Sequence, residues 1–231
     1  MHASLCICAL VPRLVTRTRV VLFVHRAEDR KSSNTGRLAE RCLVNSKIIL
    51  RGHATERAPR YAHAPGSEPL LLFPHEGAAP LDEVFDATAR ARLADGSLPA
   101  PTLLVPDGTW RQASKVKKRV PGLEGVRCVT LPRGAPSIYR LRVEARDTGV
   151  STIEAIARAL GILEGDEVER ALLYPFRAMV ERTLWSKGDL DDADVTGGIP
   201  VGAQRHDPRS GLRGSSSPGP APPRARCPSP A

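Results

Sequence analysis

The chain has 231 residues, of which 41% are hydrophobic and 4% aromatic, and it carries a formal net charge of +9. This length suits one sizeable domain with or without tails, and the positive charge favours an anionic partner such as a nucleic acid or a membrane surface. No apolar stretch approaches the roughly 20 residues that cross a bilayer, so we expect no membrane-spanning segment.

Runs of β-branched and other apolar residues predict strands at 19–25, 47–52, 68–74, 102–106 and 126–132. The last three runs are continuous rather than alternating, as expected of strands buried on both faces. Helical periods between the runs predict helices at 35–45, 82–93 and 110–120. The order of elements indicates an α/β fold with a mostly parallel sheet and flanking helices.

The C-terminal part of the folded region is expected to be helical. The segment STIEAIARAL begins with a capping box of Ser151 and Glu154, and Gly161 is predicted to end its helix. A last helix is predicted over 166–187, with Pro175 kinking or restarting it because proline lacks a backbone donor.

The chain after the last helix has a different composition. Residues 189–231 are rich in Pro, Gly, Ser and Arg and contain little that could be buried. We therefore predict a disordered tail over 189–231 that follows a single folded domain of residues 1–188.

The five cysteines are odd in number and show no disulfide-like spacing. The opening MHASLCICALVPRL lacks the basic region and cleavage site of a signal peptide, so we expect a reducing compartment and a cytoplasmic location. Cys6 and Cys8 form half of a zinc site, but no second close pair would complete four ligands, and we predict no metal site. His25 and His75 lack partnering ligands and are expected to be structural.

The stretch TLLVPDGTWRQASK joins a strand to a helix. In parallel sheets ligands lie beyond the carboxyl ends of strands, which is where Asp107 falls. Thr109 and Gln112 form a capping-box pattern, so the helix is expected to begin at Trp110. Two interpretations stay open: a functional carboxylate in a crevice, or a turn at Asp107 with a cap and a core anchor.

Basic residues follow this join. Arg111, Lys115 and Lys118 share one face of the predicted helix, and Arg140 and Arg142 flank an aromatic in RGAPSIYRLR. Such groups suit RNA phosphates and bases, although a solvated face or an exposed turn would look similar.

A second strand-to-helix join, SSNTGRLAE over 32–40, offers N-cap residues and a glycine that allows backbone to approach an anionic ligand. A plain helix cap would give the same pattern. The chain has no G-x-G-x-x-G and no G-x-x-x-x-G-K-[ST], which argues against a dinucleotide site and a P-loop.

Six segments in order carry a family resemblance: CICALVP, VVLFVHRAEDRKSSNTGRLAERCL, LLFP, VPDGTWRQASK, PSIYRLR and STIEAIA. Over about residues 6–187 the chain resembles the DTW-domain family. The resemblance implies transfer of the 3-amino-3-carboxypropyl group of S-adenosylmethionine to N3 of a tRNA uridine, with release of methylthioadenosine. It also implies a SPOUT-like, knotted α/β architecture.

The resemblance also implies roles for particular residues. Asp107 and Trp110 match the D-x-T-W pattern of the family, and Trp110 and Ala113 would line the pocket for the methionine part of the donor. Thr35 would lie near the ribose, and the backbone around the remaining three positions would hold the adenine: Leu72, Phe73 and Leu131. Family members often carry a further Cys pair upstream of Cys6, which this sequence lacks, so a structural zinc is not carried over.

The chemistry agrees with the pattern at the strand end. Uridine N3–H is a weak acid, so attack on the donor would be helped by a general base, and Asp107 is the carboxylate in the predicted crevice loop. Two alternatives remain at this stage. One is an RNA methyltransferase that uses the same donor, and the other is an RNA-binding module without catalysis.

Overall fold

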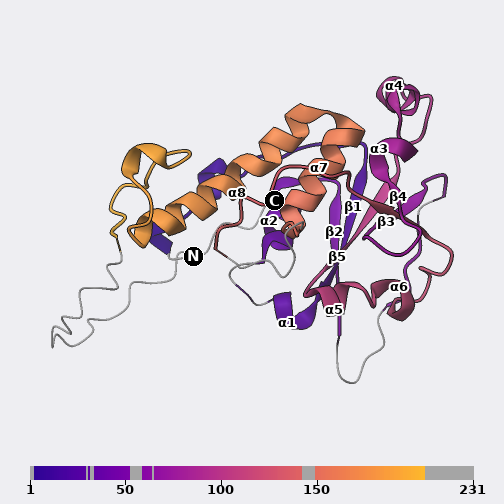
Figure 1. Ribbon diagram of the computed structural model, residues 1–231, viewed down its shortest axis with the longest axis horizontal. Coiled ribbons are helices and arrows are strands. Elements are labelled where there is room, and N and C mark those ends of the chain that lie inside the picture. The colour runs from indigo at the N-terminus through magenta and orange to yellow at the C-terminus, as the bar shows by residue number, and fades with distance from the viewer. Residues whose placement is uncertain are drawn as a thin grey trace.

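The computed structural model describes residues 3–29, 31, 34–52, 59–63, 65–141 and 149–205. Within them the chain forms a six-stranded sheet in the order β2-β1-β5-β3-β6-β4, and every strand pair is parallel (Figure 1). The strands are β1 (Arg19–His25), β2 (Ser46–Arg51), β3 (Pro69–Leu72), β4 (Ala79–Pro80), β5 (Thr102–Asp107) and β6 (Arg127–Thr130). The predicted α/β class with a parallel sheet is confirmed.

Helices cover the sheet (Figure 1). They are α1 (Arg26–Asp29), α2 (Thr35–Cys42), α3 (Leu81–Val84), α4 (Ala87–Asp95), α5 (Trp110–Ala113), α6 (Val116–Arg119), α7 (Thr152–Glu164) and α8 (Asp166–Ser186). Three short 3₁₀ segments, η1 (Ala3–Leu5), η2 (Cys8–Leu10) and η3 (Asp192–Asp194), complete the described elements.

The two faces of the sheet bury separate cores. Val20, Leu22 and Val24 of β1 join the larger cluster with side chains of α2, α7 and α8, whereas Val21 and Phe23 join a smaller cluster with α6. This division follows from the period of two along a strand, since successive side chains point to opposite faces. It explains why the central strands are continuously apolar.

The central strand β5 is buried at every position and extends beyond its neighbour β3. The two strands pair only as far as Leu71 and Leu104, so β5 runs on from Val105 to Asp107 with one edge free of β3. Pro106, which has no N–H to donate, falls in this stretch. The early end of β3 therefore opens space beside the last residues of β5.

Two predicted helices are each divided in two. The expected helix over 110–120 consists of α5 and α6, and the expected helix over 82–93 consists of α3 and α4. In the second case Asp86 interrupts the helix and caps α4, accepting a hydrogen bond from the N–H of Ala89 at 2.8 Å.

The prediction that Gly161 ends its helix is wrong. Helix α7 continues to Glu164, and its C-cap is Gly165, whose φ is +109°. A Cβ at Gly161 would collide with the side chain of Glu169 on α8. The glycine is thus a site of close helix packing. Helix α8 runs from Asp166 to Ser186 through the buried Pro175 without restarting.

Order extends further toward the C-terminus than the composition indicated. Val195 is buried with Leu5 and Trp185, and the indole N–H of Trp185 donates to Asp192 at 2.7 Å. The buried guanidinium of Arg182 donates to the carbonyls of Gly198 at 2.9 Å, Gly197 at 3.0 Å, and Cys6. The predicted tail from 206 onward lies outside the described residues. No helix of the described part combines the length and apolar composition needed to cross a membrane.

Candidate active site

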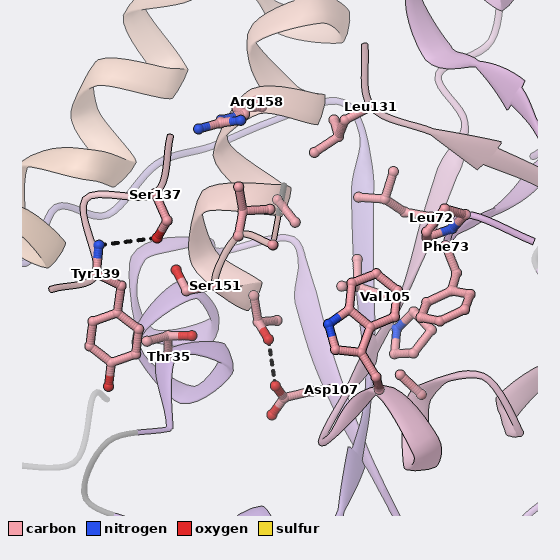
Figure 2. A pocket seen from close by; sticks show the side chains of 18 of the residues that line it. Thr35, Leu72, Phe73, Val105, Asp107, Leu131, Ser137, Tyr139, Ser151 and Arg158 are labelled. Carbon is pink, nitrogen blue, oxygen red and sulfur yellow. Dashed lines mark hydrogen bonds between the residues drawn. The ribbon is translucent and has the colours of Figure 1, made fainter. Parts of the chain in front are cut away.

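A cavity of about 1040 Å³ lies beyond the carboxyl ends of β3, β5 and β6. In the view of Figure 2, Asp107 lies between Thr35 and Tyr139 on one side and Phe73 on the other. All residues that the family resemblance implies at the donor line this one cavity: Thr35, Leu72, Phe73, Trp110, Ala113 and Leu131. Segments that are distant in the chain therefore meet around Asp107.

Asp107 is 6% exposed, and both of its carboxylate oxygens accept a hydrogen bond. The side-chain amide of Asn34 donates to Oδ2 at 2.7 Å, and the hydroxyl of Thr152 donates to Oδ1 at 2.5 Å. Asn34 is the N-cap of α2 and Thr152 is the first residue of α7. The carboxylate is thus set against the positive ends of two helix dipoles, which favour negative charge.

The segment Asn34-Thr35-Gly36 packs closely against the carboxylate of Asp107. Asn34 caps α2 with its Oδ1, which accepts from the N–H of Arg37 at 2.8 Å, and its Nδ2 remains to reach Asp107. A Cβ at Gly36 would stand 3.0 Å from Oδ2 of Asp107 and 3.0 Å from Leu22. Sequence reasoning identified the cap but missed its second bond, because that bond joins two distant segments.

The start of α7 forms the opposite side. Glu154 is buried and accepts hydrogen bonds from the N–H of Ser151 at 2.8 Å, the N–H of Ile138 at 2.8 Å and the hydroxyl of Ser137 at 2.7 Å. The Glu154 half of the predicted capping box is therefore present, and it also fixes the PSIYR segment. The Ser151 hydroxyl is buried beside the cavity and makes no capping hydrogen bond.

Aromatic rings form the remaining wall. The rings of Trp110 and Phe73 lie 5.3 Å apart, and those of Phe73 and His75 lie 4.9 Å apart. Trp110 opens α5, whose predicted capping box is confirmed: the N–H of Thr109 donates to Gln112 at 2.8 Å, and the N–H of Gln112 donates to Thr109 at 3.3 Å. The cap thus fixes where the indole projects from the strand end.

The basic residues divide into separate groups. Arg111 lines the large cavity and, with Lys115, a second cavity of about 270 Å³. Lys118 and Arg140 are exposed and line neither cavity, and Arg142 lies outside the described residues. The sequence did not single out Arg51 or Arg119, which line the second cavity. No cluster of three or more metal-ligating side chains occurs in the described part of the chain.

Comparison with known proteins identifies the family of the chain. The DTW domain matches residues 1–184 of the chain. The chain belongs to the DTW-domain family. Its DTW motif is the stretch Asp107 to Trp110, which lines the large cavity.

Curated relatives of this DTW protein carry closely related names. It is 28% identical over 78% of its length to tRNA-uridine aminocarboxypropyltransferase 2 of Drosophila melanogaster, covering 70% of that chain. It is 29% identical over 76% of its length to the Macaca fascicularis protein of the same name, covering 59% of it. It is 30% identical over 77% of its length to tRNA-uridine aminocarboxypropyltransferase A of Arabidopsis thaliana, covering 76% of it. No solved structure matched the chain.

Proposed function

We propose that this protein transfers the 3-amino-3-carboxypropyl group of S-adenosylmethionine to N3 of a uridine in tRNA and releases methylthioadenosine. The observation that carries the proposal is the position of Asp107 among all the residues expected at the donor. The names of the curated relatives support the same reaction. The knotted, SPOUT-like chain path implied by the family resemblance stays a prediction.

The cavity has the size and lining that two substrates need. Ligand pockets commonly enclose roughly 300 to 1,000 Å³, so a cavity of about 1040 Å³ has room for the donor and a nucleobase. Trp110 offers an aromatic face to a sulfonium cation, which is attractive through the ring quadrupole. In the proposal Trp110 and Ala113 hold the methionine part, Thr35 the ribose, and the backbone at 72, 73 and 131 the adenine.

The reaction displaces a neutral leaving group. The N3 lone pair forms a bond to the γ-carbon of the donor, the bond from that carbon to sulfur breaks, and its electron pair stays on the sulfur of methylthioadenosine. The N3 proton passes to Asp107. Each carboxylate oxygen has two lone pairs, and Asn34 and Thr152 occupy one on each oxygen, which leaves an acceptor for the proton. Because the two bonds fix the carboxylate, the residue would gain from orientation.

The RNA is proposed to lie along the basic side of the cavity. Arg111 lines the large cavity itself, and in the proposal it contacts the tRNA together with Lys115, Lys118, Arg140 and Arg142. Phosphate contacts of this kind position a nucleic acid without reading its sequence. A cytoplasmic location is part of the proposal, and the free, buried thiols of Cys42 and Cys128 are consistent with a reducing compartment.

One assay tests the reaction. Purified protein is incubated with tRNA and S-adenosylmethionine, and the digested RNA is analysed by mass spectrometry. An aminocarboxypropyl adduct on uridine, with methylthioadenosine in the supernatant, is expected. A methyl adduct would establish a methyltransferase instead, and binding without any adduct would indicate an RNA-binding module.

A variant tests the base. Asp107→Ala is expected to bind donor and tRNA but to lose most of the transfer rate, since general-base catalysis contributes about 10² to 10⁴-fold. Asp107→Asn keeps the shape and can still accept one hydrogen bond. A folded Asp107→Ala protein that transfers at the wild-type rate would eliminate the assignment.

A further inference from the structure

The second cavity differs in character from the first. Its volume is about 270 Å³ and its lining is His25, Arg51, Thr109, Arg111, Gln112, Lys115 and Arg119. Four of these seven side chains are cations, and none is a carboxylate. Within the described part of the chain, the ion pairs join other residues, so these four positive charges face one another without a neutralising partner in the cavity.

Arg51 makes this cavity more than an exposed basic patch. Its residue is 4% exposed, and one terminal nitrogen donates to the carbonyl of Gln112 at 2.9 Å. Its Nε is buried and has no hydrogen-bond partner. A buried charged donor without an acceptor is costly, commonly by about 1–3 kcal/mol or more, so the positive charge of Arg51 is poorly balanced at the wall of this cavity.

The electrostatics of the group favour binding of an anion. Burial lowers the pKa of the Arg51 guanidinium, the nearby charge of Arg119 lowers it further, and Asp107 acts in the opposite direction. Burial and the charge of Arg51 also lower the pKa of His25. These directions describe cations crowded together, and an anion between them would relieve the crowding.

The two cavities adjoin. Thr109 and Arg111 line both, so the DTW loop forms the boundary between the large cavity and the small one. S-adenosylmethionine carries no phosphate, whereas each nucleotide of RNA carries one. An anion in the small cavity would therefore be within reach of a nucleotide whose base enters the large cavity.

We propose that the small cavity binds a backbone phosphate beside the target nucleotide, through Arg51, Arg111, Lys115 and Arg119. This inference rests on the proposed function and adds to it the point at which the RNA is held. The guanidinium of Arg51, held in place by its bond to Gln112, would supply a preorganised donor, and the more exposed Lys115 and Arg119 would complete the phosphate site. Fixing the phosphate would set the depth to which the uridine enters toward Asp107.

The test uses the full chain and two variants at the rim, Lys115→Gln and Arg119→Gln. Arg51→Gln is less suitable because it also removes the bond to Gln112. Arg170→Gln is the matched control, since Arg170 is exposed on α8 and lines neither cavity. Binding of tRNA is measured by fluorescence anisotropy at several KCl concentrations, and binding of S-adenosylmethionine is measured by calorimetry.

Each rim variant is expected to weaken tRNA binding several-fold and to reduce the slope of log affinity against log salt by about one. Donor affinity is expected to stay unchanged, and the control should keep the wild-type slope. Weaker donor binding with unchanged tRNA binding would overturn the proposal, because the anion would then be the donor carboxylate. If Arg170→Gln lost as much tRNA affinity as the rim variants, the proposal would also be overturned, because the overall positive charge of the protein would then account for the effect.

Phosphate ethylation interference locates the contact. Ethylation of one phosphate near the modified uridine is expected to block binding of the wild-type protein and to have a much smaller effect on Arg119→Gln. The same footprint in both proteins would contradict a phosphate at this cavity. Failure of the transfer assay would remove the proposed reaction but leave these binding results standing, so the two proposals fail separately.

Discussion

The side-chain amide of Asn34 donates to Asp107 across 73 residues of sequence, at 2.7 Å. The pair joins the segment between α1 and α2 to the end of β5, and β5 lies beside β1, the strand that precedes α1. Asn34 also caps α2, so one residue both begins a helix and orients the proposed base. These two roles can be separated by substitution.

Asn34→Ser is expected to keep most of the helix cap, because serine is also a good N-cap, but to lose the bond to Asp107. The transfer rate should fall about 10-fold or more while the free energy of unfolding changes by about 0.5 kcal/mol or less. Asn34→Ala should lose both. Single-turnover kinetics and urea unfolding measure the two quantities, and a rate loss that merely tracks stability would speak against a positioning role.

Gly36→Ala should reduce activity, although alanine is the better helix former by about 1 kcal/mol. The added methyl group would stand 3.0 Å from Oδ2 of Asp107, so the carboxylate or the helix must move. Gly161→Ala is the matched comparison, because Gly161 is also helical but packs against Glu169 on α8. The Gly161→Ala substitution should lower the temperature of thermal unfolding and change kcat little. Equal rate losses in both variants would contradict the specific effect at Asp107.

Cys42 should resist alkylation in the folded protein. Burial raises the pKa of its thiol to about 12, so almost no thiolate is present near neutral pH. Cys6 and Cys8 are exposed and should be modified first. Peptide mass spectrometry after iodoacetamide treatment, with and without urea, checks this, and rapid labelling of Cys42 without urea would refute it.

Stability should fall on acidification, in part through His75. Burial lowers the pKa of this imidazole in the folded state, with the charge of Lys117 adding to the effect. Below about pH 6.5 the unfolded chain then binds a proton that the folded protein does not, so the free energy of unfolding decreases as pH falls. His75→Gln should flatten this dependence in urea unfolding between about pH 7.5 and 5.5. Parallel curves for both proteins would exclude His75 as a source.

Short sequence patterns correctly predicted the features that depend on residues close together in the chain. The continuous apolar runs gave the central strands, and the spacing of Thr109 and Gln112 gave the start of α5. Both depend on residues that lie within a few positions of one another. The same rules placed Asp107 at a strand end and therefore near a crevice.

Such patterns could not predict contacts between residues that are distant in the chain. Gly161 looked like a helix terminator because the sequence does not show that α8 folds back against it. Arg51 looked like the end of an ordinary strand, and only the placement of β2 beside β1 brings it to the rim of the DTW loop. The family resemblance supplied the donor residues, and the cavity brings them together without showing what each one does.

The three carbonyls held by Arg182 bear on how the protein can be shortened. Cutting the chain at Gly188, where the composition changes, would strip two of the three acceptors from a buried guanidinium and uncover Trp185. Such a protein would be prone to aggregate, and its failure to bind RNA would be misread as a function of the tail. A deletion that begins after Arg205 keeps all three hydrogen bonds of Arg182 and the segment that covers Trp185.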